Sequence, residues 1–185
     1  MSSNYLFKNF TELNPRESNE VLEGRNEESV RKWMTSDREI STEEHSKFID
    51  SLRGSEDQIY FRIEYRGNFV GVYSLTNIND RSGVGGFWIG KYARDKSLGL
   101  SVVYHSINYI FNICTINKIL GYQLKTNTAT ARLNAALGFV AVPDPTQSDI
   151  RMQYLELGRE YWERNIIKNN KLSKLIEISE RENEK

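Results

Sequence analysis

The sequence predicts a single α/β domain of the α+β type, in which a twisted, mixed but mostly antiparallel sheet of about seven strands is flanked by helices. Three observations predict it. The middle of the chain contains three short apolar runs joined by turn residues, which is typical of an antiparallel meander. The third run leads through small residues into a long helix with apolar residues at helical spacing. Further strand-like runs then alternate with one more helical segment.

The N-terminal part is expected to be helical after one strand. Asn14 and Pro15 suit an N-cap and a first helical position, and Ser41 with Glu44 forms a capping-box pattern. The expected elements are a strand over Tyr5–Leu13, a helix from Pro15 that breaks near Gly24–Asn26, a short helix around Val30–Met34 and a helix that begins after Ser41.

The meander and its continuation complete the expected sheet, and Arg66-Gly67 is a tight hairpin signal. Helices are expected after Gly99 and from Asn127 to Leu137, with Gly138 as the left-handed residue that follows. The expected strands are Gln58–Tyr65, Asn68–Leu75, Val84–Ile89, Lys118–Leu124, Phe139–Val142 and, after a loop over Pro143–Ser148, Ile150–Leu157.

The residues after the last strand are expected to extend the same domain, with 1–157 as its main part and 158–185 as a C-terminal helical extension of one or two helices. The terminal SERENEK is expected to fray. Trp162, Ile166 and Leu172 are apolar residues that would pack a second copy in a homodimer or close the back of the sheet, and the sequence leaves both open.

The composition narrows the class of protein. The 185 residues suffice for one domain with a core, and 25 basic residues balance 25 acidic ones, so neither nucleic acid nor a membrane is expected as a partner. The single cysteine, Cys114, lies on an apolar helix side and is expected to be a buried small hydrophobe. No apolar run approaches the ~20 residues of a membrane span, and the N-terminus lacks a signal-peptide pattern, so we expect a cytoplasmic protein.

The stretch Gly85–Cys114 predicts a phosphate site. After its strand come three cations, Lys91, Arg94 and Lys96, and then a Ser-Leu-Gly turn before the long helix. Backbone N–H groups at a helix start are free to bind phosphate oxygens, and the helix dipole favours negative charge there. We therefore expect a pyrophosphate at this turn. The alternative is an ordinary helix start capped by Ser97, with the cations solvated.

Two motifs give the chain a family resemblance. The acyl-CoA loop of the GNAT acetyltransferases, [Q/R]-x-x-G-x-[G/A], appears as Arg94–Gly99. The motif N-x-x-A-x-x-L-Y-x-x-x-G-F appears about 30 residues later as Asn127–Phe139, with Leu133 in place. The chain thus resembles the GNAT superfamily, which implies the GNAT fold and an acetyl-CoA-dependent N-acetyltransferase. Two departures are Ser97 for the middle glycine of the loop and Asn134 for the usual tyrosine.

A closer resemblance lies upstream, to the GNAT branch that N-acetylates the 4-amino group of a UDP-linked 4-amino-4,6-dideoxy sugar on the way to pseudaminic acid. It covers roughly residues 5–142 and implies direct transfer in a ternary complex, with no metal. The segments that carry it are Asn9–Asn14, Arg25-Asn26, Trp33-Met34, Glu43–His45, Phe48-Ile49, Leu52, Val70–Val72 and Asn77-Ile78.

The resemblance implies roles for particular residues. The amides of Leu98, Gly99 and Leu100 are expected to donate to the pyrophosphate, and the amide of Ile89 or its neighbour Gly90 to polarise the thioester carbonyl. The full set of expected cofactor-binding residues is Ile89, Lys91, Arg94, Lys96, Ser97, Leu98, Gly99, Leu100 and Asn127.

The nucleotide sugar is expected to contact Arg25, His45, Thr76 and Asn77. Arg25, beside a helix break, presents a fork of donors suited to a diphosphate. Two plainer interpretations stay open: Arg25 in a surface salt bridge, and His45 packed on its helix and bonded to a carbonyl.

The catalytic group is the weakest part of the resemblance. Asn134 can hydrogen-bond the departing sulfur or hold a water, but it cannot supply a proton. A thiol with a pKa near ~8.5 leaves tolerably well without assistance. Asn134 and Tyr122 are the expected catalytic residues, and the sequence leaves open whether Tyr122, Tyr104 or a water replaces the missing acid.

Two other functions stay open. The acceptor can instead be a protein N-terminus or another small amine on the same fold. The departures at Ser97 and Asn134 also fit a catalytically weakened protein that binds CoA or a nucleotide sugar.

Overall fold

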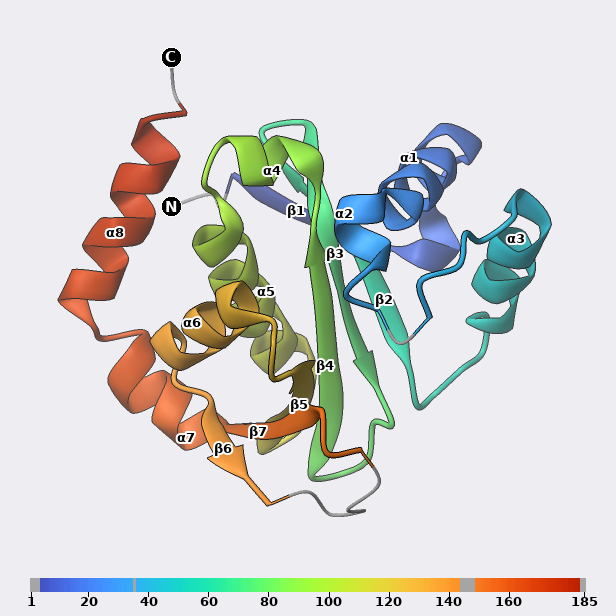
Figure 1. Cartoon of the computed structure of the whole chain (residues 1–185). Helices are drawn as coiled ribbons and strands as arrows, with labels where there is room; N and C mark the ends of the chain where they lie inside the picture. Colours follow the sequence, from blue (N-terminus) through green and yellow to red (C-terminus); the bar gives the residue numbers. More distant parts are fainter. Residues whose placement is uncertain (1–3, 35, 144–148, 184–185) are drawn as a thin grey trace.

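A twisted seven-stranded sheet with helices on both faces organises the chain in the computed structural model, which describes residues 4–34, 36–143 and 149–183 (Figure 1). The strand order is β1-β2-β3-β4-β5-β7-β6. Neighbouring strands pair antiparallel except β4 and β5, which pair parallel. This confirms the predicted fold class.

The strands are β1 (Tyr5–Asn9), β2 (Ile59–Tyr65), β3 (Asn68–Thr76), β4 (Ser82–Ile89), β5 (Lys118–Leu124), β6 (Val140–Val142) and β7 (Met152–Gly158). The helices are η1 (Phe10–Glu12), α1 (Pro15–Asn26), α2 (Glu28–Arg31), α3 (Thr42–Ser51), α4 (Lys91–Asp95), α5 (Gly99–Ile113), α6 (Thr128–Ala136), α7 (Arg159–Tyr161), η2 (Trp162–Ile166) and α8 (Asn170–Arg181). Most of the expected loop at Pro143–Ser148 lies outside the described residues.

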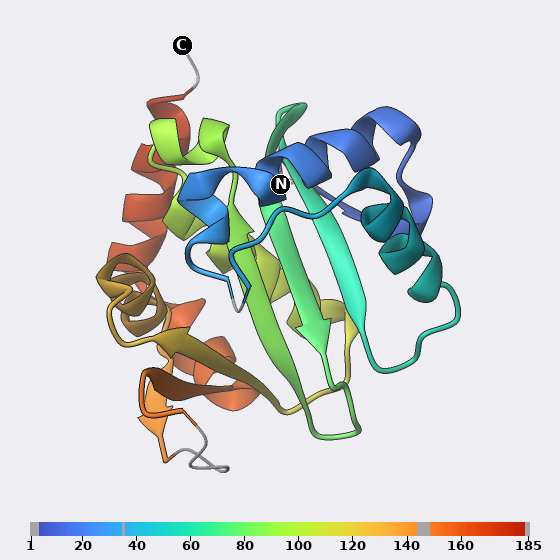
Figure 2. The same ribbon diagram turned by 45° about the vertical axis from the view of Figure 1, so that its right-hand side comes forward.

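Alternating side chains give the sheet two different faces. Phe61 and Ile63 of β2 pack with α5 in the main core. Tyr60, on the opposite face of the same strand, packs with α1 and α3 in a smaller cluster. Figure 2 shows α1, α2 and α3 together on one face of the sheet. The hairpin between β2 and β3 turns at Arg66 and Gly67, where φ is 50° and 78°, as a mirror-image two-residue turn requires.

The helix break expected near Gly24–Asn26 is present, but the extent of the first strand was wrong in detail. The first strand ends at Asn9, because the Asn9 side chain accepts from the Thr11 amide at 3.0 Å and starts the 3-10 turn η1. Helix α1 continues through Gly24 and ends at Asn26. Gly24 serves packing there, since a Cβ at this position would come within 2.8 Å of the Trp88 ring.

The C-terminal extension belongs to the core. Trp162, Ile166, Leu172 and Ile176 are buried in the same cluster as α5. The expected fraying of SERENEK was wrong for its described part. Helix α8 runs to Arg181, and hydrogen bonds of Ser179, Glu180 and Asn183 hold this part of the chain to the α4–α5 region. Within the described residues, no helix has the length and apolar character that a membrane crossing requires.

Candidate active site

The site lies where β4 and β5 separate. Ser82–Val84 of β4 pair with Lys118–Leu120 of β5, and no pairing joins the two strands beyond these residues. A cavity of about 620 Å³ fills the gap between them. Residues of α2, β4, α4, α5, β5 and α6 line it, so two motifs that are distant in the sequence meet here.

The edge of β4 that faces this cavity carries free backbone groups. The Gly90 amide donates to the Val70 carbonyl at 2.8 Å, so Gly90 is bonded within the sheet. Because antiparallel ladders alternate, the amides of Phe87 and Ile89 point to the other edge, toward β5. Of the two expected donors to a thioester carbonyl, only Ile89 therefore has a free amide.

A short helix that the sequence analysis missed, α4, precedes the expected phosphate turn. Its end is a Schellman motif: the Ser97 amide donates to the Arg94 carbonyl at 3.2 Å and the Leu98 amide to the Ala93 carbonyl at 2.8 Å. Ser97 takes the left-handed conformation at its centre, with φ of 55°. The family loop has a glycine where this chain has Ser97, and glycine is the usual residue at this left-handed position of a Schellman motif.

This geometry corrects two expectations at the turn. Ser97 does not cap α5, because the N-cap residue is Leu98 and no side-chain cap is present. The Leu98 amide is engaged by Ala93, and its side chain is fully buried, so it is not open to phosphate. At the first turn of α5, no backbone carbonyl of the described residues accepts from the amides of Gly99 and Leu100.

The three cations of this stretch differ in position. Arg94 lines the cavity, where its guanidinium donates to the Ile89 carbonyl and pairs with Glu27. Lys91 pairs with Asp95 at 2.5 Å on the exposed side of α4. Neither Lys91 nor Lys96 is among the lining residues. The structure therefore brings only Arg94 of the three to the cavity.

Asn134 and Gln123 form a polar pair on one side of the gap. The Asn134 Nδ2 donates to Gln123 Oε1 at 2.8 Å. Asn134 is only 6% exposed, and its Oδ1 has no hydrogen-bond partner among the described residues. An orphaned acceptor in a cavity wall fits a ligand that brings a donor. Asn127, also in the wall, caps α6 by accepting from the Thr130 amide at 3.1 Å.

Tyr122 lies on the opposite side of β5 from Gln123, as strand alternation requires. It is 52% exposed and lines the cavity together with Tyr60. Burial raises the pKa of Tyr60, and the neighbouring Tyr122 adds to this rise. Tyr104, the other expected substitute acid, packs on Trp162 with ring centroids 5.1 Å apart and does not line the cavity.

The expected nucleotide-sugar residues are not gathered in one place. Thr76 lines the cavity, whereas Asn77, His45 and Arg25 are not among its lining residues. His45 is 7% exposed and lies with its Nε2 3.1 Å from the Ser18 carbonyl, which is the plainer of its two interpretations. Burial lowers the pKa of this imidazole.

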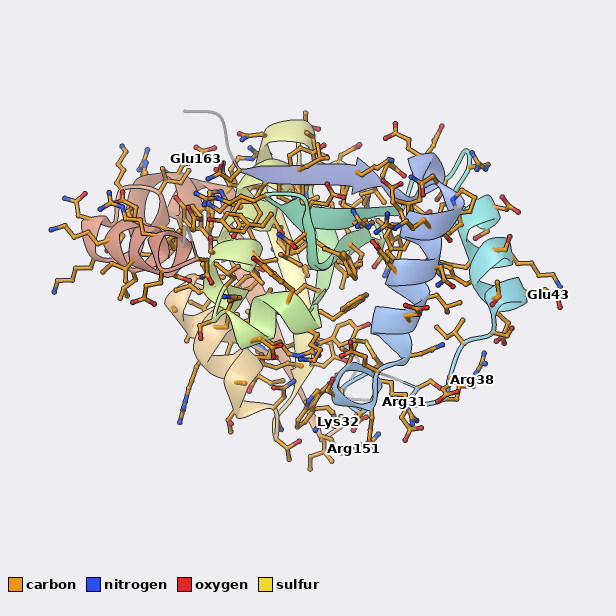
Figure 3. The ribbon with its side chains drawn as sticks, turned by 90° about the horizontal axis from the view of Figure 1, so that it is seen from above. Arg31, Lys32, Arg38, Glu43, Arg151 and Glu163 are labelled. Carbon is orange, nitrogen blue, oxygen red and sulfur yellow. The ribbon has the colours of Figure 1, made fainter. Side chains whose placement is uncertain are left out.

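Arg25 lies in the last turn of α1, directly before the break between α1 and α2, as expected. It donates to the Ser36 carbonyl at 3.1 Å, and burial, followed by the charge of Arg38, lowers its pKa. Figure 3 shows Arg31 and Arg38 along α2 and the segment that follows it. Arg25 therefore braces this segment.

Sequence reasoning missed part of the cavity wall. Tyr60, Ser74 and Trp88 come from three neighbouring strands and share one sheet face. The available signal was the pairing register, since Tyr60 lies opposite Ser74 and Ser74 opposite Gly86. Without the pairing register, the sequence does not show which small residues lie beside the aromatic residues and leave room for a cavity.

The parallel pair that splays, the free edge of β4 and the left-handed turn before α5 together define an acyl-CoA-type cleft. Residues 9–140 match the acetyltransferase (GNAT) domain family, and the chain belongs to that family. In the described residues, no group of three or more His, Cys, Asp or Glu side chains is placed to hold a metal ion.

Among curated proteins, the chain is similar to acetyltransferase PseH of Campylobacter jejuni, with 29% identity over 128 residues, 68% of this chain and 78% of the relative. Among solved structures, it resembles C. jejuni N-acetyltransferase PseH in complex with acetyl coenzyme A (TM-score 0.68, 23% identity, 84% of this chain and 99% of that one). It also resembles Vibrio cholerae spermidine N-acetyltransferase in complex with CoA and spermine (TM-score 0.75, 15% identity, 86% and 98%).

Proposed function

We propose that this protein is an acetyl-CoA-dependent N-acetyltransferase that acts on a nucleotide-linked amino sugar, a UDP-4-amino-4,6-dideoxy sugar of the pseudaminic acid pathway. The family match supports the reaction, and the PseH relative supports the acceptor. The observation that carries the choice of acceptor is the cavity wall. It is aromatic on the α2 side and contains no carboxylate among the described residues.

The residues in the wall suit the donor. Gly99 in the wall, and Leu100 next to it in the first turn of α5, offer amides to the pyrophosphate, with Arg94 as the nearby cation. The Ile89 amide is placed to polarise the thioester carbonyl, which is where charge develops during acyl transfer. Acetyl transfer forms the new C–N bond and breaks the C–S bond, so the sulfur leaves as a thiolate that needs a hydrogen-bond partner or a proton.

Two polar side chains on either side of β5, Asn134 and Tyr122, are proposed for the two remaining tasks, which are to stabilise the sulfur and to move a proton. We assign Asn134, held by Gln123, to the hydrogen bond at the sulfur, because its Nδ2 carries a second N–H beside the one that Gln123 accepts. Of the tyrosines in the wall, Tyr60, Tyr73 and Tyr122, we assign Tyr122 to moving a proton toward solvent, because it is exposed. A departing thiol with a pKa of ~8.5 requires little further help.

The carboxylate-free wall favours a sugar over a polyamine. A spermidine-type acceptor carries several positive charges, and burying them needs acidic partners. Here the charged side chain in the wall is Arg94, whose positive charge repels a polyamine. The exposed rings of Trp33 and Tyr122 offer flat apolar surfaces for a sugar or base.

Thiol release tests this function. The full-length protein is incubated with acetyl-CoA and, in parallel, with a UDP-4-amino-4,6-dideoxy sugar, spermidine or a peptide with a free N-terminus. We expect rapid thiol release with the nucleotide sugar and at least ~100-fold lower kcat/KM with the other two, since a charged amine without a partner costs several kcal/mol. Release with spermidine alone would contradict the acceptor. Binding of acetyl-CoA without release on any amine would favour a protein that only binds.

A cytoplasmic location and a homodimer are part of the proposal. Acetyl-CoA and nucleotide sugars are cytoplasmic metabolites, and the single Cys114 forms no internal disulfide. Trp162, Ile166 and Leu172, the residues expected to reach a partner, are buried in the protein's own core. Sedimentation equilibrium at several concentrations measures whether a dimer forms by other surfaces.

A further inference from the structure

The C-terminal helix α8 contacts the cofactor loop, defined here as residues Arg94–Gly99, through two backbone carbonyls. The Ser179 hydroxyl donates to the Ser97 carbonyl at 3.0 Å, and the Asn183 Nδ2 donates to the Lys96 carbonyl at 3.1 Å. Figure 1 shows the end of α8 beside α4. Ser179 on α8 and Asn183, two residues after its end, lie well beyond residue 140, where the match to the family ends.

The loop needs such support because of the residue at its centre. Ser97 holds a φ of 55°, which glycine adopts freely and a residue with a Cβ does not. The Schellman bonds occupy the carbonyls of Arg94 and Ala93. The carbonyls of Lys96 and Ser97 accept instead from Asn183, just after the end of α8, and from Ser179 on α8.

Helix α8 is itself fixed on α5 next to this contact. Glu180 accepts from the Ser101 hydroxyl and lies 3.1 Å from His105 Nε2, while the Tyr65 hydroxyl donates to its backbone carbonyl at 3.3 Å. Leu172 and Ile176 are buried against the main core. The two donors therefore lie at the end of a helix that is anchored to the core, and Asn183 Nδ2 also donates to the Ser179 carbonyl at 2.6 Å.

We propose that Ser179 and Asn183 are positioning residues for the acetyl donor: they hold Ser97 in its left-handed conformation and so keep the cofactor loop in the shape that binds the pyrophosphate. This chain thereby replaces the conformational freedom of a loop glycine with two hydrogen bonds from its C-terminal helix. The identity of the ligand rests on the proposed function, but the effect concerns donor binding alone.

Calorimetric titration of the full-length protein with acetyl-CoA tests this proposal. The double variant Ser179→Ala with Asn183→Ala should raise the Kd for acetyl-CoA about tenfold, and each single variant about threefold. The kcat at saturating donor should stay within about twofold. Ser173→Ala, the same change on α8 at a hydroxyl that makes no contact with the loop, should leave the Kd unchanged.

A rescue separates positioning from general loss of stability. Adding Ser97→Gly to the double variant should bring the Kd back to within about twofold of the wild type, because glycine needs no support at φ of 55°. An unchanged Kd in the double and single variants would overturn the proposal, and so would a raised Kd that Ser97→Gly does not restore. If wild-type protein binds acetyl-CoA but acetylates no amino sugar, the proposed acceptor fails while this test remains valid.

Discussion

Ser97 shows how one side chain can occupy a glycine position without changing the backbone. Its φ of 55° and the two Schellman bonds around it are what a glycine would show. The cost falls on Ser97 itself, since a left-handed residue with a Cβ is less stable by about 1–2 kcal/mol. Contacts elsewhere must offset that cost.

Ser97→Gly should therefore stabilise the protein. We expect the free energy of unfolding to rise by about 0.5–1 kcal/mol, which is the relief of backbone strain less the extra entropy of glycine in the unfolded chain. Urea unfolding measures it. Ser46→Gly, on the exposed side of α3, should have the opposite sign, a loss of about 0.5 kcal/mol. Equal signs for the two variants would contradict the account of Ser97.

Arg94 should be the cation that the acetyl donor uses. Arg94→Gln is expected to raise the Kd for acetyl-CoA about tenfold or more, since a charge-assisted bond to phosphate is worth roughly 1.5–3 kcal/mol. Lys91→Gln and Lys96→Gln, outside the cavity wall, should change it less than about twofold. The effect of Arg94→Gln should shrink at high salt. Equal losses in all three variants would show that the phosphates lie elsewhere.

Tyr122 and Asn134 should differ in their effect on turnover. Tyr122→Phe removes a titratable hydroxyl and should lower kcat by roughly 10²-fold or more. Asn134→Ala removes one hydrogen bond and should lower kcat by about tenfold or less. Steady-state kinetics with saturating acetyl-CoA measures both. A larger loss in Asn134→Ala would reverse the two roles assigned to these residues.

At the scale of elements, the sequence predicted the helices and strands that are marked by regularly spaced apolar residues or by capping residues. The Ser41–Glu44 capping box and the left-handed Gly138 were found as expected. Helix α4 was missed because five residues are too few to show helical periodicity. The end of α1 at Asn26 falls within the break expected near Gly24–Asn26, whereas the close contact of Gly24 with the Trp88 ring is tertiary and has no local signal.

The attachment of α8 to α5 should depend on pH. Burial raises the pKa of Glu180, but the bonds from His105 and Ser101, with the charges of His105 and Arg66, outweigh it and leave this pKa below its ordinary value. A depressed carboxyl pKa stabilises the fold above the unfolded pKa of ~4.3, and that contribution is lost as the pH falls further. Tyr5, through Ser101, and Tyr65, through the Glu180 carbonyl, are further titratable groups at this contact.

Glu180→Gln should thus lower the free energy of unfolding by about 1–3 kcal/mol at pH 7. The difference from wild type should shrink steadily below pH ~4.3, where the wild-type carboxyl becomes protonated. Thermal unfolding between pH 3 and 8 measures it. Glu177→Gln, on the exposed side of the same helix, is the matched control and should give a small, pH-independent change. A constant difference for Glu180→Gln would show that its charge does not hold α8.

For the whole molecule, site residues carried by one continuous motif were located better than those carried by packing. Arg94, Ser97, Gly99 and Asn134 all line the cavity. His45 and Arg25 do not, because the direction of a helical side chain depends on how α1 and α3 sit on the sheet. No local pattern contains that relation.

The same reasoning applies to the C-terminal extension, which the sequence predicts to be part of one domain. Residues Trp162, Ile166, Leu172 and Ile176 are at most 5% exposed. Each contributes roughly 1.5–3 kcal/mol by burial, so their joint loss is comparable to the whole stability of a domain, about 5–15 kcal/mol. A chain ending at Gly158 should show no cooperative urea transition and no acetyl-CoA binding. A chain ending at Asn183 keeps every contact described for α8 and should match the full-length protein in both measurements. Cooperative unfolding of the shorter chain would make the extension a separable unit, and the support of the cofactor loop would then have to come from within residues 1–158.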